Sequence, residues 1–264
     1  MLWLILALLS AMCEATKDYL SKKSMKKVDE YVAAWALLAL TFPYLLLLLL
    51  FVPVPPLDDT FWYATVAFSA IFIIGTVLFM KAIKRSHLSL TVPMTAFTPA
   101  FMLLTSPVLL GEFPTPAGVL GIVLVVAGAY LLNASEARRG VLEPFAVLLR
   151  ERGPALMLVV AVLWSLTATL AKLAVEHSSP VFYLIVVYAM TGSAFTFFVL
   201  LMRRDRLREI RSYWPQLAAV GLVVAISEVA LTYAFTLTLA AFAIAVKRTS
   251  IFFSSLYGFA FFKE

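Results

Sequence analysis

The sequence has few residues of the types that build catalytic and metal sites. It contains one cysteine, Cys13, which excludes an intramolecular disulfide, and two histidines, His87 and His177. Both histidines are expected near the ends of apolar segments, away from any cluster with the spacing of metal ligands. No serine, histidine and aspartate form a recognisable triad, and no phosphate-binding loop is present. We therefore expect no cofactor, no metal and no enzymatic activity.

Charge is also scarce, since 14% of the 264 residues are charged and 63% are hydrophobic. Soluble domains contain about 25% charged and 45–50% apolar residues, and a chain of this length cannot bury so large an excess of apolar surface. The composition predicts an integral, multi-pass protein of the cell (plasma or inner) membrane, with membrane lipid around it. The net charge of +6 lies mainly at the ends of apolar runs, which indicates membrane topology and no nucleic-acid partner.

Long apolar runs without period-two alternation predict an all-α membrane fold. Pro93 and Pro99 fall within one run, and prolines at such positions predict a bent or broken helix that could act as a hinge. The expected spans are 2–21, 31–52, 61–83, 89–110, 116–133, 154–175, 181–202, 214–238 and 241–262.

The loops predict the orientation of the spans. Every loop that follows an odd-numbered span carries lysine or arginine, as in SKKSMKK after the first span. Loops that follow even-numbered spans, such as VPVPPLDDT after the second, carry neither residue. The positive-inside rule therefore places the basic loops in the cytoplasm and Met1 outside.

The second half of the chain repeats the pattern of the first. Ala241–Glu264 and Ser89–Glu112 are both apolar runs of span length that end at an acidic residue. Equivalent loops have opposite charge character, because VPVPPLDDT after the second span corresponds to RRDRLREIRSYW after the seventh. The second copy must therefore enter the membrane upside down. Inverted repeats are typical of secondary transporters, whose substrate site lies near the midplane where the repeats meet.

The repeat also predicts the domain organisation. Residues 1–135 form a first repeat of five spans, and residues 154–264 form a second repeat of four. By internal symmetry, a tenth span is missing at the C-terminus. A cytoplasmic connector, residues 136–153, divides the repeats, and its segment EPFAVLLRER predicts a short amphipathic helix on the membrane surface.

Two segments resemble the EamA family of the drug/metabolite transporter superfamily. They are PMTAFTPAFMLLTSPVLLGEFPTPAGVLGIVLVVAGAYLL at 93–132 and KRTSIFFSSLYGFAFFKE at 247–264. The resemblance implies ten helices in two inverted five-helix repeats that move small metabolites by alternating access. It says nearly nothing about the substrate. The fifth and tenth helices are usually peripheral in that family, so the missing tenth need not destroy the central cavity. Its absence bears instead on stability and on the formation of a homodimer.

Two spans carry polar residues on one face at helical spacing. In the first span these include Glu14 and Lys17, and in the sixth they include Ser165 and Lys172. The lysines correspond in the repeat and either line a cavity for a carboxylate or phosphate, or snorkel to headgroups. Glu14 lies beyond the midplane, where it either pairs with Lys17 or carries a proton. Asp18, next to a loop, is expected at the membrane interface.

The eighth and ninth spans add Glu228, Tyr233, Lys247 and Arg248. Glu228 lies at a depth similar to that of the two bases, so an ion pair of Glu228 with Lys247 or Arg248 is expected because it lowers the cost of inserting both charges. One acid cannot neutralise two bases, and the surplus positive charge favours an anionic or zwitterionic substrate. The alternative is that Glu14 or a carbonyl absorbs the surplus.

The sequence therefore predicts a secondary transporter, an exporter of small polar, anionic or zwitterionic metabolites by alternating access. The alternative is a lipid-carrier flippase or an accessory membrane subunit. The hinge is expected near Pro93 and Pro99. The residues expected to bind or pass the substrate are Glu14, Lys17, Ser165, Lys172, Glu228, Tyr233, Lys247 and Arg248.

Overall fold

The computed structural model describes residues 1–25, 28–86, 91–133, 152–257 and 259. Within these ranges the chain forms helices joined by short loops, and no strand occurs in them. The predicted all-α fold is therefore confirmed. The predicted surface helix of the connector lies outside the described residues, as do His87 and Glu264.

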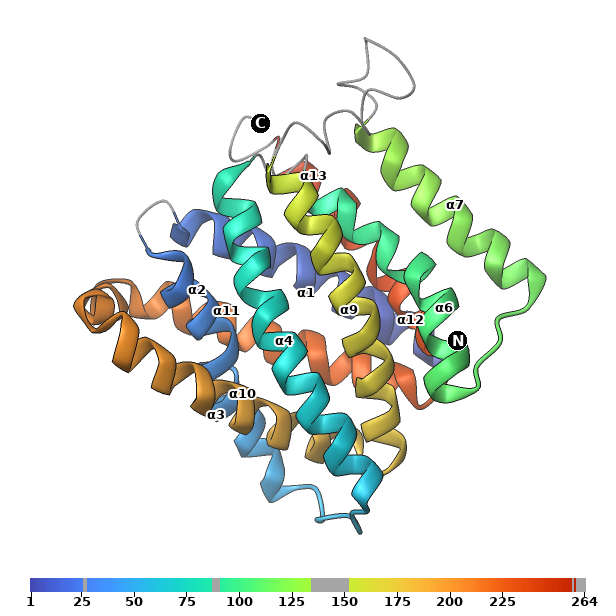
Figure 1. Cartoon of the computed structure of the whole chain (residues 1–264), viewed down its shortest axis with the longest axis horizontal. Coiled ribbons are helices and arrows are strands. Elements are labelled where there is room, and N and C mark those ends of the chain that lie inside the picture. The colour runs from blue at the N-terminus through green and yellow to red at the C-terminus, as the bar shows by residue number, and fades with distance from the viewer. Residues whose placement is uncertain (26–27, 87–90, 134–151, 258, 260–264) are drawn as a thin grey trace.

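Each predicted span corresponds to one helix or to a helix broken into consecutive pieces (Figure 1). The elements are α1 (Leu2–Met25), α2 (Glu30–Ala39), α3 (Phe42–Leu46), η1 (Leu47–Leu50), α4 (Asp59–Arg85), η2 (Val92–Phe97), α6 (Thr98–Leu110), α7 (Pro116–Asn133), α9 (Arg152–Glu176), α10 (Pro180–Met202), η4 (Arg204–Arg206), α11 (Leu207–Phe235), α12 (Ala240–Lys247) and α13 (Ser250–Tyr257).

Length and composition identify the helices that can cross a bilayer, which requires about 20 apolar residues. Helix α1, with 24 residues, is also long enough, but it carries five charged residues, Glu14, Lys17, Asp18, Lys22 and Lys23. The clearly apolar spans of sufficient length are Glu30–Leu50, Asp59–Arg85, Arg152–Glu176, Pro180–Met202 and Trp214–Phe235, with shorter apolar helices at Met94–Leu110 and Pro116–Gly128.

Three spans are interrupted. The predicted break in the fourth span is confirmed, because the 3₁₀ turn η2 precedes α6, which carries Pro99 in its first turn. The second span is interrupted at Leu40–Thr41, just before Pro43, which cannot donate a backbone hydrogen bond. The ninth span breaks between α12 and α13 at Arg248 without any proline, and the sequence did not predict this break.

The helix packing has the exchange symmetry expected of two similar halves. Helix α1 packs along α11, and α4 packs along α9. In the repeat, α1 corresponds to α9 and α4 corresponds to α11. Replacing each helix by its counterpart therefore turns the α1–α11 contact into the α9–α4 contact. The contacts of α6 with α9 and of α13 with α1 exchange in the same way. Helix α7 lies at the edge of the bundle in Figure 1. The domain boundaries themselves stay predictions.

Contacts between loops define the two ends of the bundle. At one end, here called the His177 end, the ring of His177 contacts Asp58, so the loops before α4 and after α9 lie together. At the opposite end, here called the Lys22 end, Lys22 donates hydrogen bonds to the carbonyls of Ile83 and Ser86, 3.0 and 2.8 Å away. Helices α1 and α9 therefore run in opposite directions, as the inverted repeat predicts.

Close packing brings the broken second span against α11. A Cβ atom added at Gly221 would lie 2.6 Å from the carbonyl oxygen of Leu40, so only glycine allows this approach. Thr41 donates to the Leu37 carbonyl at 2.8 Å and faces the Gly221 carbonyl at 3.3 Å. These hydrogen bonds satisfy backbone carbonyl oxygens around the interruption, where little water is available to do so.

Candidate functional site

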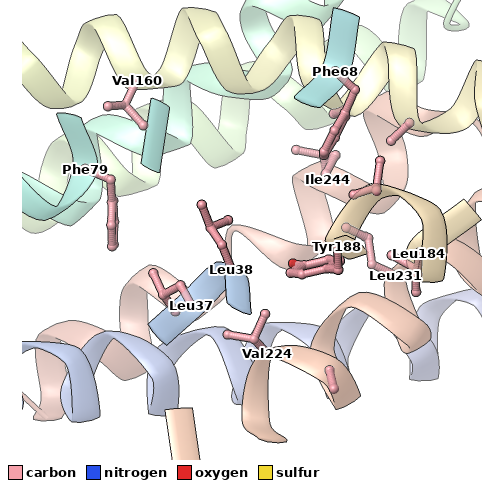
Figure 2. Close-up of a cluster of buried hydrophobic side chains, with 14 of the residues drawn as sticks. Leu37, Leu38, Phe68, Phe79, Val160, Leu184, Tyr188, Val224, Leu231 and Ile244 are labelled. Atoms are coloured by element: carbon pink, nitrogen blue, oxygen red, sulfur yellow. The ribbon is translucent and has the colours of Figure 1, made fainter. Parts of the chain in front are cut away.

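A cavity of about 100 Å³ lies in the bundle and is lined by residues of both halves. A buried water needs about 10–15 Å³ measured in this way, so the cavity has room for on the order of seven to ten water molecules or a ligand of similar size. Most of its wall is apolar or aromatic. Figure 2 shows lining side chains that converge from several helices, among them Leu37, Phe68, Leu184, Tyr188 and Ile244.

The cavity lies nearer to the His177 end than to the Lys22 end. Tyr183, in the first turn of α10, and Phe235, the last residue of α11, both line it. On the other side its lining reaches Lys17 and Phe79, and α1 and α4 continue beyond these residues to the Lys22 end. The rings of Phe79 and Trp164 lie 5.2 Å apart. Together with Lys17 they form the floor of the cavity.

Charged side chains at this floor form a continuous chain of ion pairs. Lys17 contacts Glu14 at 2.5 Å and Asp18 at 3.2 Å. Lys247 contacts Glu14 at 3.5 Å and Glu228 at 3.0 Å. The order is therefore Asp18, Lys17, Glu14, Lys247, Glu228, with acids and bases alternating. We call these five residues the ion chain.

Local geometry explains how the ion chain forms. Glu14 and Lys17 are three residues apart on α1, so their side chains share one face of the helix. Helix α1 packs along α11, and the hydroxyls of Ser10 and Ser227 meet across this contact at 3.0 Å. This packing brings Glu228 of α11 to the same level. Lys247 ends α12 and reaches both carboxylates.

Arg248 stands apart from the ion chain. Its guanidinium donates to Thr98 Oγ1 at 3.0 Å and lies 5.4 Å from the centre of the Trp164 ring, a cation–π contact. It lines the cavity with 5% of its surface exposed, and its Nε has no hydrogen-bond partner in the part of the chain that the structure describes. No described carboxylate forms an ion pair with it within 4 Å. Arg248 is therefore placed to receive an anion.

The structure revises the charge balance expected from the sequence. The expected Glu228–Lys247 ion pair is present. The expectation that Asp18 lies at the membrane interface is wrong, because Asp18 is 2% exposed. Helix α1 continues past it to Met25, and Ser254 of α13 covers it with a hydrogen bond of 2.9 Å. The ion chain with Arg248 therefore contains three acids and three bases, which leaves no surplus positive charge.

Lys172 does not line the cavity, although it corresponds to Lys17 in the repeat. It is 6% exposed, so it does not snorkel to headgroups. It pairs with Glu112, donates to the Thr238 carbonyl at 2.9 Å and lies 3.8 Å from Glu176. Glu112 also accepts the backbone N–H of Ala240 at 3.1 Å, at the start of α12. Lys172 thus holds three segments together at the His177 end.

Two further predicted residues also lie outside the cavity lining. Ser165 is fully buried, and its hydroxyl donates to the Val162 carbonyl of its own helix. Tyr233 is 41% exposed on the outside of α11. The cavity thus brings together Glu14, Lys17, Glu228, Lys247 and Arg248 of the predicted set.

Sequence reasoning missed several residues of the site. Thr98 binds Arg248, and its position directly before Pro99, at the predicted break, was the available signal. Tyr183 and Tyr188 line the cavity, but nothing in their spacing distinguishes them from packing residues. In the described part of the chain, no three histidine, cysteine, aspartate or glutamate side chains are grouped so that they could hold a metal ion.

Comparison with known families gives one match. The model of the EamA-like transporter family matches residues 1–134 and 151–264, which together include both halves of the bundle. The curated proteins contain no significant match to the chain.

Proposed function

The chain belongs to the EamA-like transporter family, and we propose that it is a secondary transporter that exports small anionic or zwitterionic metabolites through the cavity. The observation that carries the proposal is the ion chain with Arg248 at the floor of a cavity between the two halves. Ionisable residues inside a membrane protein are costly to insert and commonly mark a substrate or ion pathway.

The chemistry of the cavity supports this substrate class. Arg248 offers a planar guanidinium, which suits a carboxylate or phosphate group. Glu14 and Glu228 also line the cavity and could hold the ammonium group of a zwitterion. The aromatic wall, which includes Phe68 and Tyr188, provides apolar surface for the remainder of a small substrate.

The position of the cavity supports alternating access. The loops of the His177 end before α4 and α10 carry no lysine or arginine, so the positive-inside rule assigns this end to the outside, with Met1. The cavity extends towards this end, as an outward-facing state requires. Rocking of the two halves about the breaks near Pro93, Pro99 and Arg248 would expose the same floor to the cytoplasm.

The test is a binding screen followed by transport in proteoliposomes. Purified protein is screened by thermal shift against amino acids, nucleosides and phosphorylated sugars, and compounds that bind are tested for flux in both directions. Lys247→Ala should weaken binding more than folding. Loss of the folded protein instead would favour a purely structural role. Headgroup binding without flux of any soluble compound would contradict the proposal and favour a lipid-carrier flippase.

A further inference from the structure

The buried carboxylate of Asp18 has no contact with the cavity that would explain its place in the ion chain. Asp18 is 2% exposed and does not line the cavity. Its Oδ2 accepts a hydrogen bond from Ser254, whereas its Oδ1 forms an ion pair with Lys17 Nζ at 3.2 Å but accepts no hydrogen bond from any described residue. A buried charged oxygen without a hydrogen bond is costly. A proton on Oδ1 would remove the charge.

The charge count shows when such a proton is needed. The ion chain holds three acids and two bases, a net charge of −1, and Arg248 brings the total to zero. An anion bound to Arg248 leaves a charge of −1 in apolar surroundings. Uncompensated charge in such a place is strongly unfavourable because it is removed from water. One proton on a carboxylate restores neutrality.

The three carboxylates differ in how well their charge is satisfied. Glu14 has two ammonium partners, Lys17 and Lys247. Glu228 has one, but its side chain is 22% exposed and lines the cavity, where water reaches it. Among the described residues, Asp18 has a single ammonium partner, Lys17, which it shares with Glu14, and it has almost no exposure. The proton is therefore expected on Asp18.

The groups around Asp18 agree with this assignment. Lys17 and Glu14, on α1 itself, interact with the Asp18 carboxylate electrostatically, and Ser254 of α13 donates a hydrogen bond to it. Arg248, directly after α12, interacts with it electrostatically without direct contact. Helices α2, α4 and α11 also contact α1. Among the described residues, these three helices place no acid or base within ion-pair distance of Asp18.

We propose that Asp18 is the proton-binding site of this transporter. Its Oδ1 takes up one proton when a net anion occupies Arg248 and releases that proton when the anion leaves. The inference rests on the proposed function, because it needs a substrate anion at Arg248. The loaded and the empty cluster then both carry no net charge, so an anion moves together with one proton. A zwitterion moves without one.

Arg248→Met tests the proposal without a ligand, because it removes the charge that a bound anion would neutralise. Infrared spectra of purified protein at neutral pH should show a protonated carboxyl band in Arg248→Met that is absent from the wild type. The band should disappear in Arg248→Met/Asp18→Asn. It should shift in frequency in Arg248→Met/Ser254→Ala, because the Ser254 hydroxyl donates a hydrogen bond to the Asp18 carboxyl and this variant leaves the number of charges unchanged. Arg248→Lys, which keeps the charge, is the matched control and should lack the band. A folded Arg248→Met without the band, or a band whose frequency is the same in Arg248→Met/Ser254→Ala, overturns the proposal.

If Arg248→Met does not fold, an acid titration of the wild type, followed by infrared spectroscopy, tests whether Asp18 is the proton-binding site. The first carboxyl band to appear as the pH falls should be missing from Asp18→Asn and present in Glu14→Gln and Glu228→Gln. An Asp18→Asn titration identical to that of the wild type overturns the proposal.

Proteoliposomes separate this inference from the proposed function. With gluconate, a polar carboxylate that does not cross the bilayer unaided, and inorganic phosphate as anion probes, a trapped pH dye should report proton movement with the anion in the wild type. The proton movement should be lost in Asp18→Asn, and the choice of probe distinguishes a carboxylate from a phosphate. Anion flux with unchanged proton movement in Asp18→Asn refutes the role of Asp18 alone. Absence of flux of every screened compound in the wild type refutes the proposed function, and the infrared result then decides on Asp18 by itself.

Discussion

Lys17 and Lys172 occupy corresponding positions in the two halves, yet they have different surroundings. Both are 6% exposed and both pair with carboxylates. Lys17 lines the cavity, lies 4.6 Å from the centre of the Phe79 ring and is shared between two acids of its own helix. Lys172 lies at the His177 end, where its contacts join separate segments. The repeat thus reproduces the residue, and its neighbours decide whether it belongs to a cavity or to a structural contact.

The largest effect on stability is expected from Lys172→Met. It removes the donor to the Thr238 carbonyl and the ammonium partner of the partly buried Glu112 carboxylate, which keeps only the Ala240 N–H. Removing one partner of a buried ion pair costs about 3–5 kcal/mol. Thermal unfolding in detergent should show a large drop, and Lys172→Arg should recover part of it. If Lys172→Met is as stable as the wild type, Lys172 does not form the structural contact that distinguishes it here from Lys17.

Lys17→Met should cost less stability and more function. Glu14 keeps Lys247 as a partner, so we expect a loss of about 1–3 kcal/mol, the cost of an unsatisfied buried group. Substrate flux should fall at least about tenfold, which corresponds to about 1.4 kcal/mol. Lys17→Met/Asp18→Asn restores the charge balance and should recover stability. A double variant less stable than Lys17→Met would contradict this view of the ion chain.

Glu228→Gln should have a small effect on unfolding, within about 1 kcal/mol, because its side chain is 22% exposed and Lys247 retains Glu14. Its effect should depend on the substrate. Zwitterions lose an ammonium partner, so their binding should weaken more than the binding of simple anions. Dissociation constants for both compound types in the wild type and in Glu228→Gln provide the measurement. Equal weakening of both types would contradict a direct contact with the ammonium group.

The smallest effect is expected at Asp58, whose side chain caps the N-terminus of α4. The corresponding start of α11 has no such cap among the described side chains. The Phe61 N–H and the His177 ring lower the pKa of Asp58 below its ordinary value. Stability from a lowered pKa is present above the unfolded pKa, about 3.9, and is lost as the pH falls through the folded value. Asp58→Asn should therefore lower Tm slightly at pH 7.

The difference between wild type and Asp58→Asn should disappear at acidic pH, where the wild-type carboxyl is protonated too. Asp59→Asn, an exposed neighbour in the first turn of α4, is the matched control. A Tm difference that is the same at pH 7 and below the folded pKa would show that charge is not the cause.

Much of the fold could be predicted from the sequence, and less of the site. The helix positions, the break ahead of Pro99 and the Glu228–Lys247 pair followed from apolar length, proline chemistry and equal depth in the membrane. Asp18 was misplaced because its position beside a loop indicated exposure, whereas α13 packs over it. The partner of Lys172 was also missed, because Glu112 is sixty residues away and only the fold brings the two together.

The sequence by itself determined that this is a helical membrane protein built from an inverted repeat. These properties depend on how many apolar residues stand in a row and on where the charges interrupt them. Only the tertiary structure decided which charges meet, because depth along a helix can be counted in residues but the direction in which a side chain points depends on its neighbours. Asp18, Glu14 and Glu228 form one cluster with Lys17 and Lys247 because α1 packs along α11 and the ninth span breaks at Arg248.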